Sequence, residues 1–217
     1  MSAALVPNRL MFRFEVPVRR APDGLGIDGH VAKWTDELLF PPLCRLDGRQ
    51  PFGRVWIAWS EAGLFVACAV AGKRLPLRCS PQAYWKGDNL RLCTDMRGAR
   101  DIRRASRFCQ QFYFLPTGGP AGGPVGGSAR ILRAREDAPI VPPGRIRVAA
   151  RVADDGYFLE AHVPADALAG FDPEEHRRIG IYYMLEDGDF GQQYLTVGDD
   201  LGWYIDPSTW ATGVLVD

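Results

Sequence analysis

The sequence has no charge imbalance, no closely paired cysteines and no long apolar run, and each absence argues against a class of protein. Lys plus Arg and Asp plus Glu both total 26 among 217 residues. This balance argues against nucleic acid or an acidic membrane surface as the main partner. The five cysteines include no C-x-x-C pair, which argues against a disulfide framework or a zinc site. No apolar run approaches the length of a transmembrane helix.

The N-terminal residues, MSAALVPNRLMFRFEVPV, lack the basic stretch and long apolar run of a signal peptide. Together with the unpaired cysteines, they favour a reducing, cytoplasmic location. A leader missing from this sequence would instead make the protein extracellular.

Helical patterns are scarce, and short alternating runs rich in Val, Phe, Tyr and Trp lie between Gly, Pro and Asp turns. Residues 55–70 and 145–163 each predict a hairpin. Further strands are expected at residues 89–95, 107–115, 179–186, 192–197 and 213–216. The pattern predicts an all-β fold, an antiparallel β-sandwich or jelly roll.

One or two short helical turns are expected, about two turns at residues 30–39 and a single turn at residues 164–171. Residues 117–127, TGGPAGGPVGG, predict a flexible surface loop because they have almost no side chain to bury. Strand patterns of the same kind resume after this loop, so we expect one domain over residues 1–217.

Several short motifs follow one another along the chain in an order that resembles a known family. IDGHVAKW (27–34) precedes VWIAWSEAGLFVACAV, and WKGDNLRLCTD, QFYFLPTGG, DGYFLEAHVP, RIGIYYMLEDGD and WYIDPSTWATGVLV follow. This order, over roughly residues 27–217, resembles the family 9 carbohydrate-binding modules and the wider DOMON-like β-sandwich group. Its most specific pieces are Trp-x-x-Asp at Trp85 and Asp88, and Trp-x-x-Asp-Pro at Trp203, Asp206 and Pro207.

The resemblance implies a jelly-roll fold and a saccharide held between two tryptophans, which correspond to Trp85 and Trp203. Such rings suit the role, because large rigid aromatic side chains bind at little entropic cost. The other tryptophans lie within apolar runs and are expected to pack in the core or at its rim (Trp34, Trp56, Trp59 and Trp210).

The polar residues of the resembled family are replaced here. Its acidic residue after the first Trp corresponds to Arg91, its Arg and Asn to Tyr113 and Leu115, and its Gln to Met184. Period-two counting nevertheless predicts polar rows on three strands, which supply the candidate ligand contacts Arg91, Gln111, Tyr113 and Glu186. Because Arg91 can bind an acidic group, the ligand could be a saccharide or an acidic sugar derivative.

An acidic run at Glu186, Asp187 and Asp189 could bind Ca²⁺ or act as a carboxylate pair, but a hairpin turn with solvated charges is the favoured interpretation. Asp88 is expected to form a turn or accept backbone hydrogen bonds. Calcium is implied only by the family resemblance, and the sequence has no dense acidic loop of the EF-hand type. We therefore expect no cofactor.

Two functions from different classes fit these observations. The first is a non-catalytic carbohydrate-binding-like module. The second is a structural or protein-interaction β-sandwich that has lost sugar binding, with a protein as its partner. A hydrolase using Asp88, Asp95 or Glu186 is less well supported, because no nucleophile lies at a readable spacing from a base.

Overall fold

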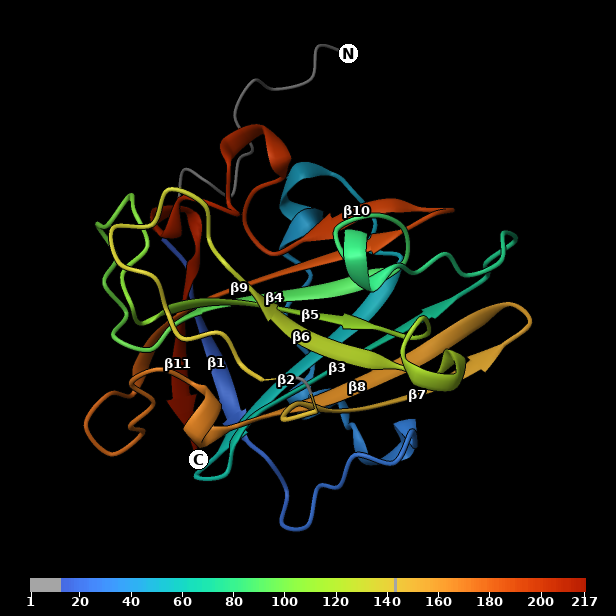
Figure 1. Ribbon diagram of the computed structural model, residues 1–217, viewed down its shortest axis with the longest axis horizontal. Coiled ribbons are helices and arrows are strands. Elements are labelled where there is room, and N and C mark those ends of the chain that lie inside the picture. Colours follow the sequence, from blue (N-terminus) through green and yellow to red (C-terminus); the bar gives the residue numbers. More distant parts are fainter. Residues whose placement is uncertain (1–12, 143) are drawn as a thin grey trace.

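The structure, a computed structural model, describes residues 13–142 and 144–217, and these residues are nearly all strand and loop (Figure 1). Their strands are β1 (Glu15–Arg20), β2 (Gly53–Ser60), β3 (Gly63–Ala71), β4 (Asn89–Asp95), β5 (Cys109–Leu115), β6 (Val125–Ala129), β7 (Arg147–Ala153), β8 (Gly156–Pro164), β9 (Arg178–Asp187), β10 (Gly191–Tyr194) and β11 (Ala211–Val216).

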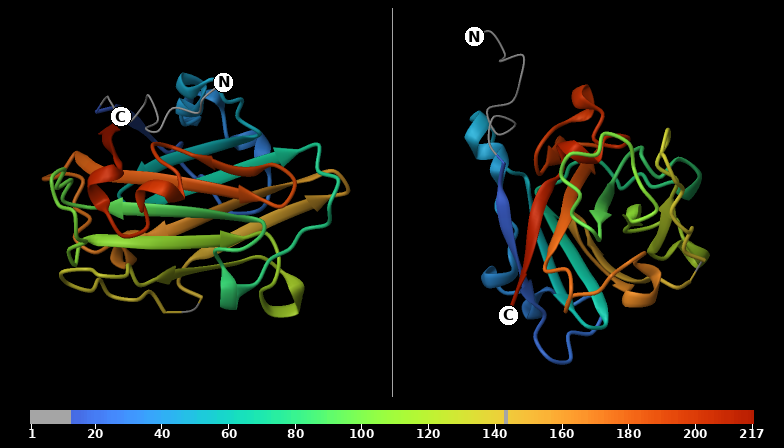
Figure 2. Two further views of the ribbon diagram at one scale, coloured as in Figure 1. Left: turned by 90° about the horizontal axis from the view of Figure 1, so that it is seen from above. Right: turned by 90° about the vertical axis from the view of Figure 1, so that its left-hand side faces the viewer.

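The strands form one sheet in the order β6-β5-β4-β9-β11-β1-β2-β3-β8-β7, with β10 paired to β9. Contacts of β5 with β8 and of β6 with β7 bring the two ends of this order together. The sheet therefore folds into two facing layers (Figure 2), as a β-sandwich requires. One detail differs from the expected antiparallel arrangement, because β1 pairs in parallel with both β11 and β2.

The strand predictions are confirmed, except that the strand expected at residues 192–197 ends at Tyr194. The hairpin at residues 55–70 is β2 and β3, and the hairpin at residues 145–163 is β7 and β8. The expected strand at residues 89–95 coincides with β4. The alternating side chains of these segments fit the two-residue period of a strand, and for this reason the pattern located them well.

Helical structure among the described residues consists of short 3-10 turns, more numerous than predicted. They are η2 (Val31–Lys33), η3 (Asp36–Leu38), η4 (Leu43–Asp47), η5 (Pro81–Ala83), η6 (Pro120–Gly122), η7 (Ala165–Ala167), η8 (Asp199–Leu201) and η9 (Pro207–Thr209). No helix in the described ranges has the length and apolar character needed to span a membrane.

Part of the Gly/Pro tract is strand rather than loop. Val125, Gly126 and Gly127 belong to β6 and pair with β5. A Cβ at Gly127 would lie 2.6 Å from the Tyr113 ring, and one at Gly126 would lie 2.7 Å from a Val148 methyl group. These glycines therefore permit close packing. The expected loop is correspondingly shorter and ends before residue 125.

The hydrophobic core lies between the two layers. From β4, β5 and β9, which lie in one layer, it includes Leu90, Leu92, Phe112, Phe114 and Leu185. A smaller hydrophobic cluster lies on the outer side of β2, β3 and β8, which belong to the other layer, where residues 21–39 cover these strands. All residues of β4 are buried. Its second face, opposite the core, is therefore also covered, and this face leads to the candidate site.

Glu160 fastens the segment at residues 26–34 to β8. Its fully buried carboxylate accepts hydrogen bonds from the backbone N–H of Asp28 at 2.7 Å, from the backbone N–H of Gly29 and from the indole N–H of Trp34 at 2.7 Å. The Lys33 ammonium lies 3.3 Å away. This carboxylate is thus the common acceptor for the whole segment.

Replacing Glu160 by Ala is expected to lower the free energy of unfolding by about 3 kcal/mol, because buried donors lose their acceptor. Urea denaturation measures the change. Glu174→Ala, at an exposed site, is the control and should change stability by less than about 0.5 kcal/mol. Equal stability of the two variants would contradict this role.

Candidate functional site

A cavity of ≈ 720 Å³ opens over the outer face of β4, β5 and β9. Three of the chain's exposed large apolar side chains line it: Trp85, Leu132 and Tyr204. The remaining lining residues are Tyr84, Lys86, Arg91, Gln111, Arg130, Glu186 and Asp199. Four of the six residues predicted from the sequence therefore lie around one cavity, namely Trp85, Arg91, Gln111 and Glu186.

The register of β4 with β5 and β9 determines which polar side chains lie at the base of the cavity. Arg91 on β4 pairs with Tyr113 on β5 and with Met184 on β9. Cys93, two residues further along β4, pairs with Gln111, while Glu186 pairs with Asn89. The predicted polar rows thus do share one sheet face, because partners in adjacent strands point to the same side.

Arg91 and Glu186 form an ion pair at the base of the cavity. The Arg91 side chain is buried, and its guanidinium lies 4.9 Å from the centre of the Trp203 ring. Burial raises the pKa of Glu186, although the charge of Arg91 opposes the increase. Among the described residues, the buried Nε of Arg91 has no hydrogen-bond partner. The base of the cavity is therefore polar and charged, but internally neutralised.

Trp85 forms one wall and is 47% exposed. Its ring meets Tyr84 edge to face, with centroids 5.2 Å apart, and Tyr84 stacks on Tyr113 at 4.4 Å. Tyr113 itself is not among the cavity-lining residues. It lies behind the wall and supports Tyr84, a role that differs from the ligand contact expected from the sequence.

The expectation that Trp203 is an exposed second wall needs correction, because its side chain is fully buried. One face stacks on Tyr182 with centroids 4.7 Å apart, and Arg91 lies over the ring. The indole N–H donates to Asp199 at 2.9 Å. The next residue, Tyr204, is 41% exposed and lines the cavity in its place.

An ionic cluster, formed by Lys73, Asp88, Asp187 and Asp189, lies under the Trp85 loop. The Lys73 ammonium is 2.7 Å from Asp88, 2.8 Å from Asp187 and 3.3 Å from Asp189. Asp88 also accepts the backbone N–H of Arg78 at 2.6 Å, so its predicted role as a backbone acceptor is confirmed. The cluster thereby ties the base of the Trp85 loop to the β9–β10 hairpin.

The acidic hairpin is therefore not simply solvated, as Asp187 is buried against Lys73. Burial alone would lower the pKa of Lys73, but its hydrogen bonds to Asp187 and Asp88 outweigh burial and raise it. The Lys73 ammonium takes the central position among the carboxylates of this cluster, which a bound cation would otherwise occupy. The described residues contain no group of three or more His, Cys, Asp or Glu arranged for a metal ion.

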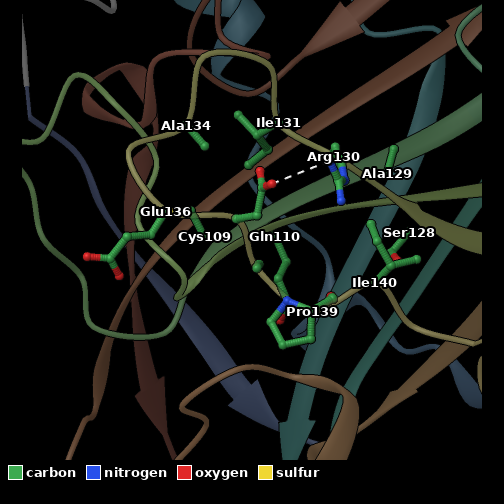
Figure 3. A pocket seen from close by; sticks show the side chains of 12 residues that line it. Cys109, Gln110, Ser128, Ala129, Arg130, Ile131, Ala134, Glu136, Pro139 and Ile140 are labelled. Carbon is green, nitrogen blue, oxygen red and sulfur yellow. Dashed lines mark hydrogen bonds and ion pairs between the residues drawn. The ribbon is translucent and has the colours of Figure 1, made fainter.

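A small void lies beside Arg130, and Figure 3 shows the side chains that line it. It lies between β5, β6 and the loop at residues 130–140, and Arg130 forms an ion pair with Asp137 at its edge. Its volume of ≈ 10 Å³ is comparable to the space that a single water molecule needs.

Sequence reasoning missed six of the lining residues: Tyr84, Lys86, Arg130, Leu132, Asp199 and Tyr204. Three of them adjoin the two predicted tryptophans, so an available signal was the aromatic pairs Tyr84-Trp85 and Trp203-Tyr204. Arg130 and Leu132 follow the glycine tract, and no local pattern there predicts a cavity wall.

No protein-family model matches this chain, and no curated protein matches it in sequence. Solved structures do match its fold. A family 9 carbohydrate-binding module from Caldicellulosiruptor kristjanssonii in complex with cellotriose has a TM-score of 0.61 at 14% identity, covering 93% of each chain. The same kind of module in complex with glucose gives 0.60 at 13% identity, covering 92% of this chain and 95% of that one.

A structure from Bacteroides uniformis, described as a candidate carbohydrate-binding protein, gives 0.56 at 10% identity and covers 94% of this chain and all of that one. At these identities the likeness establishes the fold alone. The fold of the family 9 carbohydrate-binding modules is thus the fold of this chain, as the order of its motifs predicted.

Proposed function

We propose that this chain is a non-catalytic carbohydrate-binding module whose ligand lies between Trp85 and Tyr204. The observation that carries the proposal is the pairing of two exposed aromatic rings over one cavity with a polar base. The cavity volume of ≈ 720 Å³ lies within the usual range for small-molecule sites.

A saccharide suits this combination of side chains. Aromatic rings offer flat apolar faces for the C–H face of a pyranose, and polar groups beneath them can bind hydroxyls. Gln111 supplies an amide, while Glu186 and Asp199 supply acceptors. The complexes of two structural neighbours with cellotriose and glucose support the same class of ligand.

An acidic sugar derivative is the finer proposal. Three cationic side chains line the cavity, Lys86, Arg91 and Arg130, against two carboxylates. Arg91 is paired with Glu186, and Arg130 is 3.4 Å from Asp137 in an exposed pair that solvent weakens. Lys86 has no ion pair with another described residue. A ligand carboxylate or sulfate could therefore reach Lys86 and Arg130 without breaking a buried pair.

The proposal assigns no catalytic step to the carboxylates. Glu186 is held by Arg91, while Asp199 accepts from the Trp203 indole at 2.9 Å and from the Gln192 amide at 2.9 Å. Both are acceptors held in place by these partners, and both line the cavity.

Titration calorimetry with glucose, cellotriose, glucuronic acid and galacturonic acid tests the proposal. We expect at least one of them to bind with Kd below about 1 mM. If the ligand is acidic, Arg130→Ala should weaken binding of the uronic acid by about fivefold and leave the neutral sugar unaffected. No binding across this panel would contradict the proposal and favour the protein-interaction hypothesis.

A further inference from the structure

The ≈ 720 Å³ cavity lined by Trp85 and Tyr204 is the principal cavity, and a second concavity lies against β10. Its volume is ≈ 300 Å³, and its walls include Arg49, Gln50, Phe190, Gln192 and Tyr194. These residues come from the segment after η4 and from the β9–β10 hairpin. None of these residues lines the principal cavity.

The two concavities meet where β9 pairs with β10, because Glu186 lines the first and pairs with Gln192, which lines the second. Arg91, at the base of the first, pairs with Met184, and Met184 pairs with Tyr194, which lines the second. Two strand spacings separate Arg91 from Tyr194, a distance of about 10 Å. An oligosaccharide of a few units is long enough to extend from one concavity to the other.

A thin polar boundary separates them. Gln192 lines the second concavity and donates its amide N–H to Asp199, which lines the first, at 2.9 Å. Gln192 is only partly buried. A ligand that crosses this boundary would pass over one amide side chain and could exchange hydrogen bonds with it.

The walls of the second concavity repeat the chemistry of the first. Phe190 is 41% exposed and stacks on Phe52 with ring centroids 5.3 Å apart, so it offers a supported apolar face. Arg49 donates to the Tyr194 hydroxyl at 3.1 Å, and it has no ion pair with a carboxylate of the described residues. Exposed Gln50 adds an amide. An aromatic face beside several hydrogen-bonding groups is the combination that the proposed saccharide site also presents.

Hydrogen bonds fix the backbone of Phe52, the residue on which Phe190 stacks. The buried side chain of Gln193 accepts the backbone N–H groups of Phe52 at 2.8 Å and Gly53 at 3.0 Å, and it donates to the Gly53 carbonyl at 2.9 Å. This amide fixes the residue on which Phe190 stacks. Support of this kind beneath an aromatic face reduces the entropic cost of binding.

We propose that the second concavity is an additional saccharide subsite, which holds a further sugar unit of an oligosaccharide anchored between Trp85 and Tyr204. This inference rests on the proposed function, since the first unit must bind in the principal cavity. With this subsite, the chain binds oligosaccharides in preference to single sugars.

Calorimetry with two matched pairs of probes tests the subsite, glucose against cellotriose and galacturonic acid against trigalacturonic acid. For the sugar type that binds, the trisaccharide should bind about tenfold more tightly than the monosaccharide, because both sites are engaged at once. Phe190→Ala and, separately, Arg49→Ala should remove most of this gain and change the monosaccharide Kd by less than about twofold.

Leu46→Ala, at a 50% exposed position on η4 outside the concavity, is the control and should retain the full gain. Thermal unfolding shows whether each variant is folded, and Arg49→Ala provides the answer if Phe190→Ala is not. A trisaccharide that binds no better than its monosaccharide, or a gain that survives both variants, overturns the subsite and leaves the proposed function standing. Failure of every probe to bind overturns both.

Discussion

Replacing Trp85 and Tyr204 together by Ala is expected to abolish measurable saccharide binding and leave the fold intact. The two rings are 47% and 41% exposed, so the core does not depend on them. Aromatic residues at the centre of binding sites commonly contribute more than 2 kcal/mol each. We therefore expect affinity to fall by at least about 100-fold, or roughly 3 kcal/mol, in titration calorimetry.

Two comparisons make this experiment specific. Leu75→Ala removes another large apolar side chain, 50% exposed but outside the cavity, and should leave binding unchanged. Trp203→Ala should instead destabilise the fold by about 3–5 kcal/mol, because it empties a buried site between Tyr182 and Arg91. If the Trp85 and Tyr204 double variant binds as tightly as the wild type, the ligand does not lie between these rings.

The contrast between Trp203 and Tyr204 shows where sequence reasoning ends. The sequence places two aromatic residues side by side before Asp206 and Pro207, but it does not determine which one faces outward. The choice depends on Gly202, whose backbone is left-handed with φ of 62°, and on Asp199, which accepts the indole N–H. These are tertiary constraints within a loop, and a two-residue period does not apply there.

Strands were predictable for the opposite reason. Period-two alternation located β4 to the residue and predicted polar rows containing Arg91, Gln111 and Glu186 on three strands, and the register of the sheet brings these rows to one face. The pattern failed at β6, because Gly126 and Gly127 have no side chains to alternate, and their place in the sheet depends on Tyr113 and Val148 across from them. The strand residues at the base of the site were thus predictable from the sequence, whereas Trp85 is the one loop residue of its walls that was predicted.

The ionic cluster is the second feature that local patterns missed. Lys73 lies 15 residues before Asp88 and 114 before Asp187. No local pattern in the three segments predicts that these charged side chains are buried. The hairpin therefore looked like a turn with solvated charges. Only the approach of the Trp85 loop to the β9–β10 hairpin removes these side chains from water and gives their charges a structural role.

Replacing Lys73 by Met is accordingly expected to lower the free energy of unfolding by about 3–5 kcal/mol, because the buried carboxylates of Asp88 and Asp187 lose their counter-charge. Urea denaturation at neutral pH measures the loss. Arg74→Met, at the exposed neighbouring position, is the matched control and should change stability by less than about 0.5 kcal/mol.

The difference in the free energy of unfolding between the wild type and Lys73→Met should become smaller as the pH falls. In the wild type, burial opposes the charge of Asp88, but Lys73 and backbone donors outweigh it and keep its pKa below the ordinary value. Its ionised form therefore stabilises the fold above that value, and this contribution is lost on acidification. In the variant, the unpaired carboxylates instead become easier to bury once protonated. The two stabilities should therefore converge toward pH 4.

Neutralising a partner should rescue part of the loss, because the penalty arises from uncompensated charge and not from the missing lysine as such. Lys73→Met combined with Asp187→Asn is therefore expected to be more stable than Lys73→Met alone. Saccharide affinity should follow the same order, since Asp88 and Asp187 connect the Trp85 loop to the hairpin that carries Glu186. A double variant less stable than the single one would show that Asp187 contributes through its own backbone hydrogen bonds, and that the charge balance around Lys73 is secondary.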